Sequence, residues 1–120
     1  MRNQIFLVFT LVFVALTNYS SIAQNSPKKI QTDEFTVHGV CSMCEKRIEK
    51  AALISGVMSA AWDKDLQNLK VIYKSKKVSL KEIKKAVAQA GHDTDDIKAP
   101  DDAYSTLPAC CAYRDGVKVH

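Results

Sequence analysis

Residues 34–52 of the chain read EFTVHGVCSMCEKRIEKAA. Within this stretch the spacing of apolar residues changes from that of a β-strand to that of an α-helix. At its start, Phe35 and Val37 alternate with polar neighbours, which predicts a β-strand. After a glycine and a Cys-x-x-Cys sequence, apolar residues recur at helical spacing, with Ile48 and Ala52 on one face. The stretch therefore predicts a strand, a short loop that carries two cysteines, and a helix.

The sequence downstream continues this order of strands and helices. Residues 57–62 and 69–74 are separated by a polar turn and predict a β-hairpin, while Ser79 and Glu82 form a capping box that opens a second helix. The expected elements are strand 34–39, helix 45–56, strand 57–62, strand 69–74, helix 79–91 and a short edge strand 93–98. This β-α-β-β-α-β order predicts an α+β, ferredoxin-like sandwich, in which a four-stranded antiparallel sheet carries two helices on one face.

The N-terminus has the three-part pattern of a secretory signal peptide. Residues 5–16 are apolar except for Thr10, and a polar stretch then ends at Ser21-Ile22-Ala23. A helix of that apolar length spans about 18 Å, too short for a hydrocarbon core of about 30 Å, so we expect cleavage and no stable membrane span afterwards. The expected segments are a signal peptide (1–23), a linker (24–32), one domain (33–99) and a C-terminal tail (100–120). The expected location is outside the cytoplasm, in the periplasm.

Composition excludes several functions. The net charge of +4 over 120 residues is mild and the lysines are spread along the chain, so nucleic acid is not an expected partner. We find no Ser/His/Asp arrangement, phosphate-binding loop or paired carboxylates with a catalytic partner. The sequence thus predicts a binding protein and not an enzyme.

The chemistry of the chain is concentrated at Cys41 and Cys44. The first N–H groups of a helix have no internal partner and favour an anion, so a thiol placed there has a lowered pKa. Two thiolates suit soft ions, Cu(I) first and then Zn, Hg or Cd. Two ligands suffice for Cu(I) but are too few for a closed structural zinc site. We therefore expect an open site for a soft metal ion.

At this point the chain resembles the heavy-metal-associated domain family. That family includes copper chaperones, the N-terminal modules of metal-pumping P-type ATPases and periplasmic mercury-binding proteins. The resemblance implies the ferredoxin-like fold, metal binding by Cys41 and Cys44, and a partner such as a metal-transporting P-type ATPase or another metal-handling protein. The protein would act as a monomer or as a metal-bridged dimer. The residues that carry the resemblance are Val37-His38-Gly39-Val40-Cys41-Ser42-Met43-Cys44, Ile48-Glu49-Lys50-Ala51, Gly56-Val57 and Ala90-Gly91-His92-Asp93.

The chain departs from the family pattern at three places. Gly39-Val40 precedes the first cysteine without the Met that the family usually has there. His92 stands where the family often has Tyr, Phe or Lys, and it is either a polar loop residue or a third metal ligand. The tail adds Cys110 and Cys111, which lie outside the common domain.

The role of Cys110 and Cys111 stays open at this point. They can add sulfurs to the main site, form a second site or relay, or bond to other cysteines, whereas a bond between the two neighbours themselves would be strained. Apolar and aromatic residues nearby predict that the tail packs on the domain; these are Tyr104, Leu107 and Tyr113.

A thiol–disulfide oxidoreductase is the alternative function, with Cys41 as the exposed nucleophile. The element order opposes it, because two β-α units separated by a hairpin leave no place for the cis-proline strand of a thioredoxin site. Pro100 is the one proline between the motif and the tail, and it follows the last expected element. Metal binding is therefore the preferred hypothesis.

Overall fold

The computed structural model describes residues 29–116 and residue 119. Within these residues the order is β1 (Ile30–Thr36), α2 (Ser42–Ala52), β2 (Val57–Asp63), β3 (Asn68–Lys74) and α3 (Leu80–Gln89). A short helix, α4 (Asp101–Ser105), and two 3-10 turns, η1 (Ala109–Cys111) and η2 (Tyr113–Asp115), follow. The predicted signal peptide and residues 24–28 of the predicted linker lie outside the described residues.

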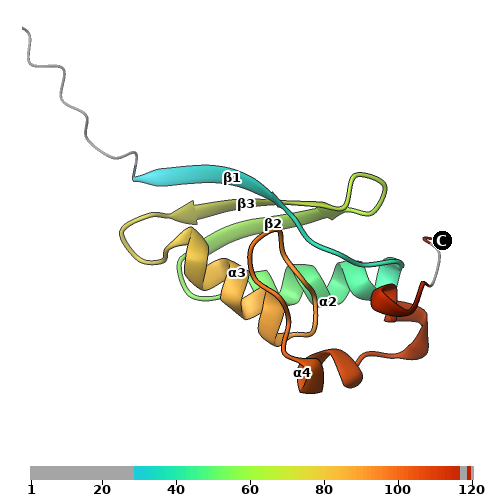
Figure 1. Cartoon of the computed structure of the whole chain (residues 1–120). Helices are drawn as coiled ribbons and strands as arrows, with labels where there is room; N and C mark the ends of the chain where they lie inside the picture. Colours follow the sequence, from blue (N-terminus) through green and yellow to red (C-terminus); the bar gives the residue numbers. More distant parts are fainter. Residues whose placement is uncertain (1–28, 117–118, 120) are drawn as a thin grey trace, which may run out of the picture.

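The sheet has the strand order β1-β3-β2, and both pairings are antiparallel. Leu69 of the central strand pairs with Phe35 on one side and Trp62 on the other. Leu69 and Val71 alternate with exposed or half-buried neighbours, as a strand with one covered face should. Figure 1 shows α2 and α3 lying together on that face, so the predicted two-layer α+β arrangement is confirmed.

The two helices contribute the apolar faces that the sequence predicts. Ile48 and Ala52 of α2 and Ile83 and Val87 of α3 are buried in the core. The helix α3 begins with the predicted capping box, because the Ser79 side chain accepts from the backbone of Glu82 and the Glu82 carboxylate accepts from the backbone of Ser79.

The first strand begins earlier than predicted. The structure starts β1 at Ile30 and ends it at Thr36, where the sequence predicted residues 34–39. Residues 30–32, expected to be linker, therefore pair with β3 along its edge. The burial of β1 is weak, and only Phe35 is buried in it, which explains why the hydrophobic alternation did not reveal its first half.

The predicted fourth strand is wrong for the described residues, in which the sheet has three strands. The segment after α3 makes one isolated antiparallel bridge, between Val37 and Thr94. Thr94 then forms a local turn with Ile97, through its backbone N–H (2.9 Å) and its hydroxyl (3.2 Å) to the Ile97 carbonyl. Local hydrogen bonds of this kind compete with the hydrogen bonds between paired strands. The segment therefore forms a turn after one bridge and does not continue as a strand.

The C-terminal tail folds back on the domain, as its apolar residues predicted. Leu107, Cys110 and Tyr113 pack against the core cluster. In Figure 1 the tail, drawn in orange to red, runs from α4 toward the loop and first turn that open α2. No helix among the described residues is long and apolar enough to cross a bilayer.

Candidate metal centre

The first turn of α2 places two sulfurs together. Cys41 is the residue that precedes the helix, with extended backbone angles (φ −147°, ψ 175°), and Cys44 lies in its first turn. Their Sγ atoms are 3.5 Å apart. Cys44 is fully buried and Cys41 is 5% exposed, so the pair faces inward from the end of the helix.

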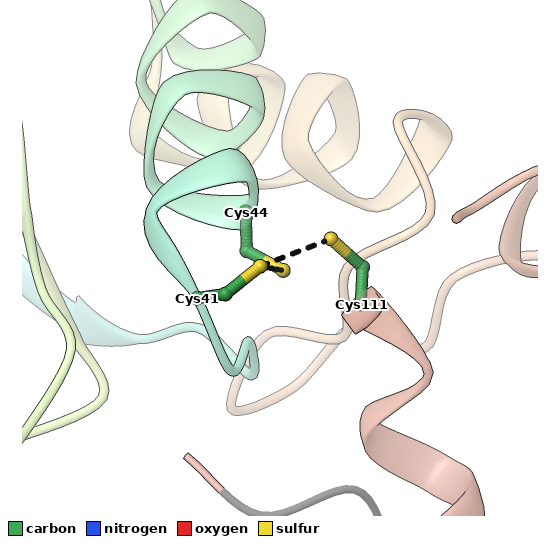
Figure 2. A group of neighbouring side chains, drawn as sticks. All are labelled: Cys41, Cys44 and Cys111. Atoms are coloured by element: carbon green, nitrogen blue, oxygen red, sulfur yellow. Dashed lines mark hydrogen bonds between the residues drawn. The ribbon is translucent and has the colours of Figure 1, made fainter. Parts of the chain in front are cut away.

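The tail supplies a third sulfur. The turn η1 places the Sγ of Cys111 at 3.5 Å from the Sγ of Cys41, although 70 residues separate them in the sequence. Cys111 is also fully buried. Figure 2 shows the three thiols converging from α2 and from the tail, and all three sulfurs lie within 4.8 Å of one another.

Cys110 lies at the outer side of this group. Its Sγ is 4.0 Å from the sulfurs of Cys41 and Cys111, and 3.7 Å from the thioether sulfur of Met43. Cys110 is half-buried, and Met43 is exposed. All four cysteines are free thiols in the structure.

Close packing fixes the loop before Cys41. A Cβ atom built on Gly39 would lie 2.9 Å from the ring of Trp62 and 3.1 Å from the Cβ of Cys44. The indole N–H of Trp62 donates to the carbonyl of Val37 at 3.0 Å. Val40, which directly precedes Cys41, is buried in the same core cluster. The loop therefore holds the two motif cysteines without the Met that the family usually has before the first of them.

Two of the buried thiols, Cys41 and Cys111, differ in acidity. Burial raises the pKa of the Cys41 thiol, but hydrogen bonds from Cys44, Cys111 and the backbone of Met43 outweigh it and lower the pKa to about 7, from an ordinary value of 9.0. Burial and the neighbouring thiols raise the pKa of Cys111. These pKa shifts favour a thiolate at Cys41 beside a protonated thiol at Cys111. The thiolate is the form of cysteine that binds a metal ion.

His92 is fully buried but does not join the sulfur group. Its Nδ1 lies 2.7 Å from the carbonyl oxygen of His38, and its ring stacks on Tyr113 with centroids 5.6 Å apart. Burial lowers the pKa of His92, so the ring is neutral at pH 7. Among the described residues, the set of donor atoms within 4.8 Å of one another contains three cysteines and not His92. Its role as a ligand stays a prediction.

The polar bonds that hold the tail in place were not predicted from the sequence, although the packing of Tyr113 was. Arg114 donates to the carboxylate of Asp93 through Nε (3.1 Å) and Nη2 (2.6 Å), and to the carbonyl of Ala99 (2.8 Å). The hydroxyl of Tyr113 donates to the carbonyl of Gly91 at 2.7 Å. No local pattern in the sequence joins Arg114 to Asp93, because the two partners are 21 residues apart.

Comparisons with known proteins agree with this geometry. The sequence matches no family model and no curated protein. Among solved structures, the CopZ metallochaperone is similar at 29% identity and a TM-score of 0.52, over 53% of this chain and 98% of that one. Oxidized MerP from Ralstonia metallidurans CH34 is similar at 28% identity and a TM-score of 0.52, over 55% of this chain and 94% of that one.

A third structure is the Cu(I)-loaded N-terminal domain of a potential copper-translocating P-type ATPase from Bacillus subtilis. It is 33% identical with a TM-score of 0.51, and the match covers 54% of this chain and 84% of that domain. Sequence identity at this level, over nearly the whole of a domain with the same fold, indicates common descent. The chain belongs to the heavy-metal-associated domain family.

Proposed function

We propose that this protein is an exported metallochaperone or metal scavenger that binds one soft metal ion, Cu(I) before Zn, Hg or Cd, through Cys41, Cys44 and Cys111. The observation that carries the proposal is the convergence of three buried sulfurs within 4.8 Å. Three thiolates in an apolar surround select soft ions over hard ones. Export rests on the signal-peptide pattern at the N-terminus, and the periplasm is the proposed location.

The spacing of the sulfurs favours three ligands over two. With metal–sulfur bonds of about 2.3 Å, a linear two-sulfur site needs the sulfurs about 4.6 Å apart, and a planar three-sulfur site needs them about 4.0 Å apart. Cys41 is 3.5 Å from both Cys44 and Cys111, so a three-sulfur site needs the smaller movement. Cys111 thus converts the two-cysteine carrier site of the sequence motif into a site of higher affinity.

Burial opposes the alternative redox function. A thiol–disulfide oxidoreductase needs an exposed nucleophile that a substrate disulfide can reach. Cys41, the sulfur with the lowered pKa, is 5% exposed, and Cys44 is covered completely. The proposed partners are a metal-transporting P-type ATPase or another metal-handling protein, to which the ion passes. No catalysis is assigned to the protein, which works as a monomer or as a metal-bridged dimer.

Anaerobic competition titration tests the proposal. Reduced protein is titrated with Cu(I) against a chromophoric chelator, beside a Cys41→Ser/Cys44→Ser double variant and a Cys111→Ser variant. We expect one tightly bound Cu(I) per chain, loss of binding in the double variant, and an affinity lower by about tenfold or more in Cys111→Ser. Met58→Leu, which changes an exposed sulfur residue of β2, is the control.

Unchanged affinity in the double variant would place the metal site elsewhere. Wild-type affinity in Cys111→Ser would restrict the site to the two cysteines of the motif. Disulfide reduction by the metal-free protein, at rates that depend on Cys41, would favour the redox function instead.

A further inference from the structure

The three sulfurs of the proposed site are closed off from solvent. Cys44 and Cys111 are 0% exposed and Cys41 is 5% exposed. Ligand exchange between proteins requires that a donor sulfur approach the ion while its present ligands still hold it. An ion bound by these three sulfurs alone offers a partner no direct approach, so a further group has to carry it between the surface and the interior.

Cys110 and Met43 occupy the position that such a group needs. The sulfurs of Cys110, Cys41 and Cys111 form a second triangle, with sides of 4.0, 3.5 and 4.0 Å. This outer triangle shares its Cys41–Cys111 side with the inner triangle, which Cys44 completes. The thioether of Met43 lies 3.7 Å from Cys110 on the outer side, and Met43 is 51% exposed.

We propose that Cys110 is the transfer ligand of this protein, and that Met43 assists it as the first soft contact at the surface. The inference rests on the proposed function and adds a pathway to it. An arriving soft ion is held by Cys110, Cys41 and Cys111 in the outer triangle. It then moves to the inner triangle as Cys44 replaces Cys110, while Cys41 and Cys111 remain bound throughout. Release to a partner is the reverse exchange.

The exchange step balances without a redox partner. The bond between the ion and the Cys110 sulfur breaks, and a bond between the ion and the Cys44 sulfur forms. The proton that the Cys44 thiol loses as it binds is taken up by the released Cys110 thiolate. The ion keeps its oxidation state. Because Cys41 and Cys111 hold the ion throughout the exchange, the ion is never released into solution.

Opening of the whole tail is the competing route, and the contacts of the docked tail oppose it. Arg114 is bonded to Asp93 at 2.6 Å, and the Tyr113 hydroxyl accepts from the backbone N–H of Asp93 at 2.8 Å. These bonds hold η2, which directly follows the turn η1 that contains both Cys110 and Cys111. Adjacent residues of this turn thus present one sulfur to the interior and the next toward the surface, which allows exchange while the tail stays docked.

Transfer kinetics and equilibrium affinity, measured on the same purified protein, separate the roles. Cu(I)-loaded protein is mixed anaerobically with a chromophoric Cu(I) chelator in a stopped-flow instrument. In Cys110→Ser we expect transfer slowed by about tenfold, a barrier increase of about 1.4 kcal/mol, with Cu(I) affinity within about threefold of the wild type. Met43→Leu should slow transfer as well, by a smaller factor.

Met58→Leu is the matched control, because Met58 is 53% exposed, nearly as much as Met43, but lies on β2 just beyond the C-terminal end of α2. It should leave the transfer rate unchanged. Near-ultraviolet circular dichroism of each metal-free variant verifies that Cys110→Ser, a substitution of a half-buried residue by one of similar size, leaves the fold intact.

Three results would overturn the inference. An unchanged transfer rate in Cys110→Ser, with faster transfer in Arg114→Gln, would assign exchange to opening of the tail. A loss of affinity in Cys110→Ser equal to that in Cys111→Ser would make Cys110 a permanent ligand. Failure of the wild type to bind Cu(I) would reject the proposed function and the pathway together, whereas the first two results reject the pathway alone.

Discussion

The Nη2 atom of Arg114 lies 2.6 Å from Oδ1 of Asp93, and this pair joins the C-terminal tail to the loop that follows α3. Both side chains are mostly buried, and a second nitrogen of the guanidinium bonds the other carboxylate oxygen at 3.1 Å. The planar group also lies over the ring of Tyr104, 4.4 Å from its centroid. The pair therefore fixes the segment that follows Cys111, the third sulfur of the proposed metal centre.

Arg114→Gln should destabilise the protein by about 2 kcal/mol, because it removes a two-bond ion pair and leaves the Asp93 carboxylate partly buried without its cation. Urea denaturation at neutral pH measures this change. Lys81→Gln, which removes the same charge from an exposed position on α3, should change stability little. Equal effects of the two substitutions would mean that net charge, and not the pair, accounts for the loss.

Stability should fall in acid through Asp93. Burial alone would raise the pKa of its carboxyl, but the hydrogen bonds from Arg114 and from the backbone of Ala99 outweigh burial and hold the pKa below its ordinary 3.8. A carboxyl with a lower pKa in the folded state stabilises the fold fully above its unfolded value. That contribution is lost as the pH falls through the folded value.

The stability difference between wild type and Asp93→Asn should thus be constant between about pH 5 and pH 7 and shrink below about pH 4. Urea denaturation of both proteins across this range measures it. A difference that grew as the pH fell would contradict the sign of the pKa shift.

Titration of the metal-free protein should reveal the acidic thiol of Cys41. The pKa of Cys41 is lowered to about 7, and that of Cys111 is raised, so thiolate absorbance in the ultraviolet should rise with a midpoint near pH 7 that belongs to Cys41. Cys41→Ser should abolish this midpoint, and Cys110→Ser should retain it. A midpoint that survives in Cys41→Ser would assign the acidic thiol to another cysteine.

Gly39→Ala should disturb the core beside the metal centre. The added Cβ would meet the Trp62 ring at 2.9 Å, and crowding of this kind in a packed interior costs about 2 kcal/mol. Trp62 is the only tryptophan of the chain, so its fluorescence reports both the unfolding transition and the local change. Wild-type stability together with unchanged emission would show that the loop relaxes freely around the methyl group.

The elements that carry strong local signals were predictable. The hairpin of β2 and β3 is marked by alternation and a polar turn, and α3 by the capping box of Ser79 and Glu82, all of which lie within a few residues of one another. The positions of Cys41 and Cys44 at the start of α2 follow from the same local reasoning. These features depend on short-range geometry, which a single sequence contains.

The parts that were wrong or left open depend on distant partners. The first half of β1 is polar and becomes a strand because β3 offers an edge to pair with, and residues 93–98 lose their strand because Thr94 and Asp93 bond elsewhere. The pairing of Cys111 with Cys41 spans 70 residues. No local pattern in the sequence brings Cys111 to Cys41, so the sequence left three roles open for the tail cysteines.

The position of Cys111 has a consequence for the mechanics of the chain. An ion held jointly by Cys41 and Cys111 would close a loop of 70 residues. In its effect on the unfolded chain this resembles a disulfide, for which closing a loop of such length is worth about 4 kcal/mol. Unlike a disulfide, however, this crosslink is removed without any redox change, when a competing thiol takes the ion. Delivery of the ion would then also remove the crosslink between Cys41 and Cys111. The metal-free protein would therefore be unfolded and degraded more easily than the loaded protein.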